Sequence, residues 1–366
     1  MGEIKARNIL LVCTSLNMGG AENQAVWLAN KLDTEGYKVH FISLKQKGVL
    51  NDDLNENINV RNFKIASSKN KITKVINALS SIKQIVEIMK TNKVETAISF
   101  LFHANLFTKI SLAFIGRDIK HIVAVRNDRL SKRSSRVSNI RNFIFKNFII
   151  SSETPIVFNS EAGRKNFNLE KKYKQFVIYN TPLNNPRIFD KQSDKFVYVG
   201  RLDELKNTPA LVDAVKDLRD SGIQIVIDIY GTGPDLQVLK SKVKSYKIEN
   251  QITFKGLDKN IRNNLSEYKA LILPSTHEGM PNVIIEAMNS KIICIATDTG
   301  DTKNLIKQNR GILIDGYNST NIASAINSYL RLSKQEKTDI QNNAYQFVQN
   351  TLDEKTIFKK WENLIS

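Results

Sequence analysis

The chain has 366 residues, of which 41% are hydrophobic and 25% are charged, and its formal net charge is +18. This length and composition are those of a globular protein with two domains, and they exclude a disordered chain. The positive charge indicates an anionic partner: nucleic acid, acidic lipid or a phosphorylated substrate. A merely lysine-rich soluble protein from an A/T-biased genome is the alternative.

Cysteine usage and hydropathy indicate the compartment. Cys13 and Cys294 lie far apart in apolar, strand-like runs, which excludes a disulfide framework and favours a reducing cytosol. Residues 1–7 lead directly into a strand, with no signal-peptide pattern. The longest apolar run, residues 99–116, is interrupted by His103, Asn105 and Lys109, so it falls short of a transmembrane helix. We therefore expect a soluble protein or one peripheral to a membrane.

Apolar runs and helical spacing alternate along the first half of the chain. Strands are expected at residues 8–14, 39–44, 59–65, 96–101, 121–126, 156–160 and 176–180. Helices are expected at residues 21–32, 72–89, 103–115 and 137–150, with a short one near Glu161. Such alternation predicts a parallel sheet with helices on both faces.

Residues 181–194 interrupt this pattern with Pro182 and Pro186 and are interpreted as an interdomain linker. A second series of strands is then expected at residues 196–200, 224–230, 252–255, 270–273, 292–297 and 311–314. Helices are expected at residues 209–219, 235–246, 261–268, 283–289, 301–306, 321–330, 334–349 and 353–365. The predicted fold is α/β, with two doubly wound parallel-sheet domains facing across a cleft.

Several common chemistries have no motif here. The sequence contains no phosphate-binding P-loop, no G-x-G-x-x-G after the first strand and no G-x-S-x-G elbow. Its four histidines show no metal-ligand spacing, and there is no D-x-D triplet. Side chains, and not a dedicated Mg²⁺ site, would therefore neutralise the charge of a bound diphosphate.

The segment after the strand at residues 270–273 combines a sharp turn with two carboxylates. Gly279 permits close backbone approach, and Pro281 suits the first turn of the helix that follows. The start of that helix offers unpaired N–H groups to a phosphate, with Glu278 and Glu286 on either side. The alternative is an ordinary strand–helix corner with one capping and one surface glutamate.

Other candidate residues also follow predicted strands, where ligands bind in such sheets. Arg201 and Lys206 come after the strand at residues 196–200, and the alternative is that both are solvated surface cations. Gly19 and Gly20 follow the first strand, where a plain helix-entry turn is the alternative. His103 follows the strand at residues 96–101, although a lone histidine is more often structural.

Together these motifs resemble the retaining nucleotide-sugar glycosyltransferases of family 4. The resemblance is carried by the order and spacing of four patterns: Gly200-Arg201-x4-Lys206-Asn207, Gly231-x-Gly233-Pro234, Phe254-x-Gly256 and Glu278-x7-Glu286. It implies the GT-B fold, with an acceptor-binding domain at residues 1–184 and a donor-binding domain at residues 185–350. It also implies that residues 351–366, a helix carrying Trp361, cross back to the first domain.

The resemblance assigns a role to each matching residue. Arg201 and Lys206 would neutralise the donor diphosphate as it leaves, and Glu278 would hold the transferred sugar. The backbone of the next five residues would also hold the transferred sugar and would bind the β-phosphate. These residues are Gly279, Met280, Pro281, Asn282 and Val283. Met280 stands where an aromatic residue is often seen, which leaves the donor sugar open.

The nucleotide and the reacting centre complete the implied site. Glu286 would bind the ribose hydroxyls, and Gly200 and Gly231 would lie along the nucleotide. The base would be bordered by Lys255, Gly256, Leu257 and Asp258. From the first domain, Gly19 and Gly20 would close over the diphosphate and His103 would contact the donor sugar. The family retains anomeric configuration by same-face attack, without a metal, a cofactor or a protein nucleophile. The two glutamates are therefore not assigned the roles that paired catalytic carboxylates have in glycosidases.

The basic excess is concentrated in residues 117–146, which hold nine cations and two anions. The candidates for contact with a membrane or acceptor are Arg129, Lys132, Arg133, Arg136 and Arg141. Aromatic residues such as Phe143 follow them, which suits an anionic lipid surface or a polyprenyl diphosphate. A solvated loop before a core-packed helix is the alternative, and no nucleic-acid module is present.

The sequence therefore predicts a retaining, metal-independent glycosyltransferase that uses a UDP-linked hexose or N-acetylhexosamine. Its expected acceptor is a lipid-linked or polysaccharide glycan of the cell surface, and its expected location is the inner face of the cytoplasmic membrane. A nucleotide-sugar epimerase of the same fold and a non-catalytic anion- or membrane-binding protein are the two alternatives.

Overall fold

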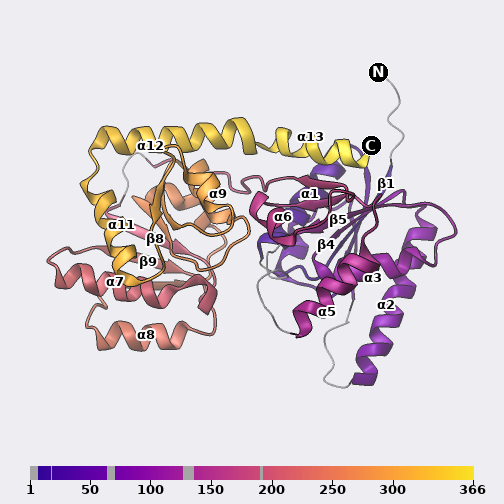
Figure 1. Ribbon diagram of the computed structural model, residues 1–366, viewed down its shortest axis with the longest axis horizontal. Coiled ribbons are helices and arrows are strands. Elements are labelled where there is room, and N and C mark those ends of the chain that lie inside the picture. The colour runs from indigo at the N-terminus through magenta and orange to yellow at the C-terminus, as the bar shows by residue number, and fades with distance from the viewer. Residues whose placement is uncertain (1–6, 18, 64–70, 127–135, 190–192) are drawn as a thin grey trace. The chain divides into compact units, whose positions relative to one another are not determined.

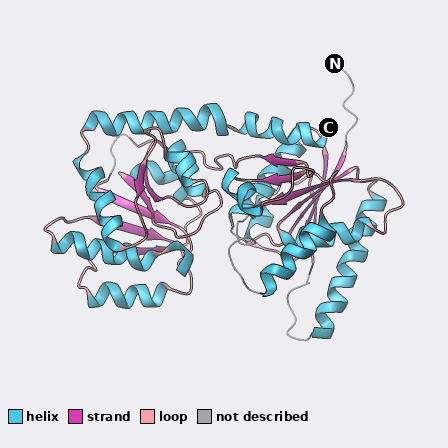
Figure 2. Cartoon of the chain, viewed as in Figure 1, coloured by secondary structure: helices cyan, strands magenta, loops and turns pink. Residues whose placement is uncertain are grey.

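The computed structural model describes residues 7–17, 19–63, 71–126, 136–189 and 193–366 (Figure 1). Contacts divide the chain into two compact domains. The first contains Met1–Asn180 and Ile357–Ser366, and the second contains Thr181–Thr356. In each domain the strands are enclosed between helices (Figure 2).

The sheet of the first domain has the strand order β3-β2-β1-β4-β5-β6-β7, and every pair is parallel. Its strands are β1 (Asn8–Cys13), β2 (Lys38–Ser43), β3 (Asn59–Asn62), β4 (Thr96–Phe100), β5 (Lys120–Val125), β6 (Ile156–Phe158) and β7 (Gln175–Val177). The connecting elements are α1 (Gly20–Thr34), η1 (Val49–Asp53), α2 (Lys71–Thr91), α3 (Phe102–Leu112), α5 (Arg136–Ile144), η2 (Phe145–Ile149) and α6 (Glu161–Phe167).

The two faces of this sheet carry separate apolar clusters. Ile9 and Leu11 of β1 pack in one cluster with α1, whereas Leu10 and Val12 pack in the other with α2. This division follows from the period of two residues along a strand. A sheet covered on both faces needs such continuous apolar strands, which explains why the apolar runs predicted it.

The C-terminal helix α13 (Glu354–Ile365) completes the first domain. Ile357, Phe358, Trp361 and Ile365 lie in the same cluster as α1 and β1. The Trp361 side chain is only 1% exposed, and its ring centroid lies 6.1 Å from that of Phe100. The predicted return of this helix to the first domain is therefore confirmed.

The sheet of the second domain has the order β10-β9-β8-β11-β12-β13 and is also parallel. Its strands are β8 (Lys195–Val199), β9 (Val226–Tyr230), β10 (Ile252–Gly256), β11 (Ala270–Leu273), β12 (Ile293–Thr297) and β13 (Ile312–Ile314). Its helices are η3 (Glu204–Lys206), α7 (Thr208–Asp220), α8 (Leu236–Ser245), η4 (Ile261–Glu267), α9 (Asn282–Asn289), α10 (Thr302–Ile306), α11 (Ser319–Arg331), α12 (Lys334–Phe347) and η5 (Val348–Leu352).

The predicted α/β fold with two parallel-sheet domains is confirmed, and the differences are local. The expected helix at residues 137–150 changes to a π-helical turn at Phe145, and the expected helix at residues 261–268 is a 3₁₀ helix. Pro281, expected in the first turn of α9, is instead its N-cap, with ψ of 109°. An extended residue at this position leaves the following N–H groups at the helix start pointing outward.

Candidate active site

The candidate donor site lies at one edge of the second sheet. Strands β9, β8, β11 and β12 are neighbours and run parallel, so their carboxyl ends meet at that edge. The loops and helix starts that follow them contain the predicted residues from Gly200 to Lys206, Gly231, and the corner from Glu278 to Val283. Residues separated by up to about eighty positions in the sequence thus come from adjacent strand ends.

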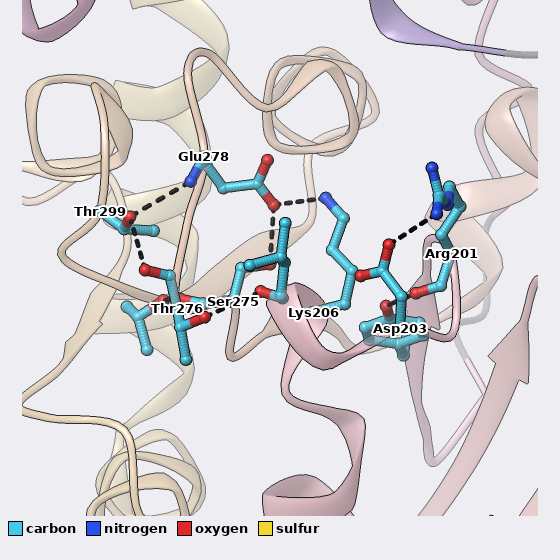
Figure 3. A network of polar contacts seen from close by, with 10 residues as sticks. Arg201, Asp203, Lys206, Ser275, Thr276, Glu278 and Thr299 are labelled. Carbon is cyan, nitrogen blue, oxygen red and sulfur yellow. Dashed lines mark hydrogen bonds and ion pairs between the residues drawn. The ribbon is translucent and has the colours of Figure 1, made fainter. Parts of the chain in front are cut away.

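An ion pair between Lys206 and Glu278 lies at the centre of this site (Figure 3). Lys206 Nζ is 2.5 Å from Glu278 Oε1, and the hydroxyl of Ser275 donates to the same oxygen at 2.7 Å. The Lys206 side chain is 23% exposed and that of Glu278 is 10% exposed. A charged pair this far from bulk water keeps more of its Coulomb attraction than a surface pair.

Arg201, the other predicted cation, is placed differently. Its guanidinium lies 2.9 Å from Asp203 Oδ2 and its side chain is 66% exposed. The hydroxyl of Tyr198 donates to the carbonyl oxygen of Arg201 at 2.8 Å, which fixes the backbone beneath it. The loop after β8 therefore presents two cations, one half-buried on Glu278 and one exposed beside Asp203 (Figure 3).

The corner at Glu278 is supported by the loop after β12, which the sequence reasoning missed. The backbone N–H of Glu278 donates to Thr299 Oγ1 at 3.2 Å, and that of Asp301 donates to the carbonyl of Gly279 at 2.9 Å. Gly300 has φ of 57°, and a Cβ there would lie 2.3 Å from the carbonyl oxygen of Glu278. The sequence did offer a signal for this loop: Thr299 and Gly300 follow a predicted strand, and a glycine after a strand is the pattern that identified Gly231.

The predicted glycines of the donor site pack backbone against backbone. Gly231 has φ of 138°, and a Cβ there would lie 1.8 Å from the carbonyl oxygen of Gly200. The N–H of Gly231 also donates to the carbonyl of Gly256 at 2.7 Å. The structure thus brings Gly200, Gly231 and Gly256 together, and internal packing alone requires a glycine at Gly231. Lys255 and Leu257, which flank Gly256, are exposed.

Glu286, the predicted ribose ligand, is far more buried than Glu278. Its side chain is 2% exposed, and Oε1 lies 3.5 Å from Nε of Arg262. Burial raises the pKa of this carboxyl, and the nearby guanidinium partly offsets that rise. The remaining residues of the corner differ in exposure: Met280 and Pro281 are buried, and Gly279, Asn282 and Val283 are half-buried.

In the first domain, the predicted Gly19 and Gly20 begin α1, with Gly19 as its N-cap. A Cβ at Gly19 would lie 2.3 Å from Oε2 of Glu22, so this turn is closed around a carboxylate that the sequence reasoning did not single out. Glu22 Oε1 accepts a hydrogen bond from Ser15 Oγ at 3.2 Å. Burial raises the pKa of Glu22, and the hydrogen bond from Ser15 partly offsets that rise.

His103 lies in the first turn of α3, at the end of the neighbouring strand β4. The preceding Leu101 has φ of 73° and ψ of 158°, a backbone region that side chains other than glycine avoid. His103 is exposed, yet partial burial together with the cations Arg141 and Lys45 lowers its pKa. The neutral imidazole is therefore the dominant form at pH 7.

The basic segment is described in part. Arg129, Lys132 and Arg133 lie outside the described residues, as does the side chain of Arg136. The Arg141 guanidinium lies over the ring of Phe102 at 5.6 Å. The apolar residues that follow are divided: Phe145, Ile149 and Ile150 are buried, whereas Ile140, Phe143 and Phe148 are 58%, 68% and 49% exposed. The segment thus combines cations with exposed apolar side chains.

The described residues contain neither a metal-binding cluster nor a membrane span. In that part of the chain, no group of three or more His, Cys, Asp or Glu side chains could hold a metal ion. No helix among the described residues is both long and apolar enough to span a bilayer. Metal independence stays a prediction.

Known proteins resemble this chain in sequence. The family described as "Glycosyl transferases group 1" matches residues 183–347. The amylovoran biosynthesis glycosyltransferase AmsD of Erwinia amylovora is 23% identical over 365 residues, covering 98% of this chain and 99% of that protein. A Campylobacter jejuni α-1,4-N-acetyl-D-galactosaminyltransferase, named for a diNAcBac-PP-undecaprenol-linked acceptor, is 25% identical over 366 residues and 98% of both chains.

Solved structures share the fold. A glycosyltransferase from Rickettsia africae superposes with a TM-score of 0.81 at 18% identity, covering 99% of this chain and 98% of that one. Anabaena HepE, solved in complex with UDP and glucose, gives 0.79 at 19% identity, with 97% and 98% covered. The chain therefore has the GT-B fold, and the match over residues 183–347 together with the polysaccharide-biosynthesis relatives supports a glycosyltransferase similar to those of family 4.

Proposed function

We propose that this glycosyltransferase moves a hexose or N-acetylhexosamine from a UDP-sugar to a lipid-linked or polysaccharide acceptor in the synthesis of a cell-surface glycan. The observation that carries the proposal is the half-buried Lys206–Glu278 pair at the edge of a nucleotide-binding type of sheet. HepE binds UDP-glucose, and the relatives from Erwinia and Campylobacter are named for polysaccharide and undecaprenol-linked glycans, which supports the donor and acceptor classes.

Each side chain of the pair has one part of the task. An ammonium group has three N–H donors, and Glu278 accepts from one of those of Lys206, so the others can reach diphosphate oxygens. Charge that develops on the leaving diphosphate is stabilised there with little reorganisation, and stabilisation of this kind usually makes the largest contribution to catalysis. Glu278, held by Ser275 and Thr299, accepts hydrogen bonds from sugar hydroxyls. Exposed Arg201 adds a second positive charge.

The proposed transfer retains configuration and needs no metal. The acceptor hydroxyl oxygen bonds to the anomeric carbon on the face from which the diphosphate departs. The bond between that carbon and the phosphate oxygen breaks, and the hydroxyl proton passes to the leaving phosphate. Glu278 accepts two hydrogen bonds on Oε1 and is assigned to sugar binding, since the leaving phosphate takes the proton and no protein base is needed.

The experiment that tests the function has two stages. UDP- and GDP-sugars are screened for protection against thermal unfolding, and protection by UDP-sugars alone is expected. UDP release is then measured with and without a lipid-linked glycan acceptor. Release that requires the acceptor supports transfer. Release without acceptor, with an epimerised sugar as product, supports the epimerase alternative, and the absence of both protection and release supports a binding protein.

We also propose that the first domain docks on the anionic inner face of the cytoplasmic membrane. The support is the joint presence of cations and exposed apolar side chains in α5 and η2, where Ile140 and Phe143 are 58% and 68% exposed. Val75, Ile76 and Leu79 on α2, at 59%, 59% and 62% exposed, are further exposed apolar side chains of this domain. Each cation near an anionic bilayer contributes about 1 kcal/mol.

Vesicle sedimentation tests this docking. The unsubstituted protein should bind vesicles rich in anionic lipid and leave neutral vesicles unbound at low salt. Phe143→Ser should weaken the binding by up to about thirtyfold, since about 2 kcal/mol of apolar transfer is lost for a large side chain. Val238→Ser, at an equally exposed apolar position (64%) on α8 of the second domain, is the matched control. Equal recovery on neutral and anionic vesicles would exclude membrane docking.

A further inference from the structure

The first residues of the second domain run alongside η4 before they reach β8. The N–H of Asn185 donates to Oδ1 of Asn263 at 2.9 Å, and the N–H of Arg187 donates to the carbonyl of Asn263 at 2.7 Å. Within this stretch one side chain, Asn184, reaches further into the domain. It is half-buried and touches both η4 and α9.

The amide of Asn184 bridges the backbones of two residues whose side chains also pair. Its Nδ2 lies 3.1 Å from the carbonyl oxygen of Arg262 and 3.1 Å from that of Glu286. The same nitrogen lies 2.9 Å from Ser290 Oγ, and that hydroxyl donates to the Glu286 carbonyl at 2.7 Å. Two amide hydrogens are thus shared among three acceptors, which places η4 and α9 at a fixed separation.

The separation of η4 and α9 matters because the side chains of Arg262 and Glu286 form only a long ion pair. Their side chains approach to 3.5 Å, and Glu286 Oε1 makes no hydrogen bond with any described residue although it is 2% exposed. A buried carboxylate oxygen without a hydrogen-bond donor is costly, and a ligand hydroxyl directed at it would remove that cost. Closer approach of Arg262 would satisfy the oxygen internally and would leave nothing for a ligand to gain.

The amide contacts extend to the segment where the chain leaves the domain. Asn184 Oδ1 accepts from Nδ2 of Asn289 at 3.0 Å, and Asn289 Oδ1 accepts from Nε2 of Gln349 at 2.9 Å. Gln349 belongs to η5, which directly precedes α13. The stretch by which the chain enters the second domain and the one by which it leaves are therefore both tied to the end of α9, the helix that carries Glu286.

We propose that Asn184 is a positioning residue for donor binding, acting through Glu286. By bridging the backbones of Arg262 and Glu286, it holds the Glu286 carboxylate near the guanidinium without a close hydrogen bond and so keeps Oε1 ready for a hydroxyl of the nucleotide. This inference rests on the proposed use of a UDP-sugar. Neither Asn184 nor the chain of amides belongs to the motifs that identify the donor site.

Calorimetric titration with UDP tests the proposal. Asn184→Ala should raise the Kd for UDP about tenfold, which corresponds to the loss of roughly one well-made hydrogen bond at the nucleotide. Asn185→Ala is the matched control: Asn185 is next in the chain and exposed, and it contributes only its backbone N–H to the contact with Asn263. Its Kd should equal that of the unsubstituted protein.

A double-mutant cycle separates positioning from general destabilisation. In a Glu286→Gln background, Asn184→Ala should have little further effect on the Kd, whereas its effect on the melting temperature should persist. Should Asn184→Ala fold poorly, Asn289→Ala leaves the Nδ2 contacts of Asn184 in place and should raise the Kd about threefold.

The outcomes are distinct. An unchanged Kd in Asn184→Ala, or a tenfold rise that survives in the Glu286→Gln background, overturns the positioning role while the proposed function stands. A failure of the unsubstituted protein and of Asn185→Ala to bind UDP overturns the proposed function, and the positioning role with it.

Discussion

The strand ends of the two domains are built on different principles. In the second domain, side chains of opposite charge form a short ion pair, with 2.5 Å between Lys206 Nζ and Glu278 Oε1. In the first domain Arg126, at the end of β5, is 7% exposed and hydrogen-bonds to the neutral Oδ1 of Asn180, between the rings of Phe100 and Trp361. Burial lowers the pKa of Arg126 to about 9. At these strand ends the second domain thus pairs opposite charges, whereas the first encloses the Arg126 guanidinium between aromatic rings.

This contrast predicts that the first domain depends strongly on the C-terminal helix. Trp361→Ala should lower its free energy of unfolding by about 3–5 kcal/mol, because it removes a fully buried ring and one of the two faces that enclose the Arg126 guanidinium. Both tryptophans of the chain, Trp27 and Trp361, belong to the first domain. Urea unfolding followed by the fluorescence of the remaining Trp27 therefore reports this domain alone.

Lys360→Ala, exposed on the same helix, is the control and should change the unfolding free energy by less than about 0.5 kcal/mol. A Trp361→Ala protein as stable as Lys360→Ala would show that the helix is dispensable and would remove the contrast between the domains.

For the second domain the largest expected effect is on catalysis. Lys206→Ala should lower kcat about 10²–10³-fold, since a charge directed at the leaving diphosphate is lost, while the fold persists. Acceptor-dependent UDP release measures the rate, and circular dichroism measures the fold. Lys216→Ala breaks an exposed ion pair with Asp220 at 2.6 Å, a similar bond outside the site, and should leave kcat unchanged. Near-normal turnover in Lys206→Ala would contradict the diphosphate role.

The sequence predicted elements well where one physical rule decides them. Continuous apolar strands such as Ile9–Val12 and strand-end glycines such as Gly231 follow from burial and backbone geometry. The rule that ligands bind at strand ends brought Lys206 and Glu278 to one edge, although 72 residues separate them in the chain. Their direct pairing and the 66% exposure of Arg201 depend on side-chain packing, which no local pattern encodes.

Other features have no recognisable signal in the sequence. The φ of 73° at Leu101 is imposed by the tertiary fold on a residue that does not favour it. The sequence places Asn184 in a linker, because residues 181–194 hold two prolines and consecutive asparagines without periodicity, whereas its contacts come from η4 and α9. Glu22 resembles an ordinary helix residue, and only its closeness to Gly19 distinguishes it.

The smallest predicted effect concerns acid stability, and it again separates the domains. His40, His103 and His121 all lie in the first domain, and burial lowers the pKa of each. For His121, which bonds to Ser99 Oγ at 2.8 Å, the pKa falls from 6.5 to about 3. The folded state therefore excludes a proton that the unfolded state binds below pH 6.5. Stability is fully present above that pH and is lost as the pH falls toward 3.

Between pH 7 and pH 5, His121 alone should cost the first domain about 2 kcal/mol of unfolding free energy, from the linkage between proton binding and folding. Tryptophan fluorescence during urea unfolding at the two pH values measures this loss. In His121→Gln, whose amide can still meet Ser99 but does not titrate, the drop should shrink by that amount. The remainder should come from His40 and His103. A drop that is the same in His121→Gln and in the unsubstituted protein would mean that this buried imidazole is not what makes the first domain acid-sensitive.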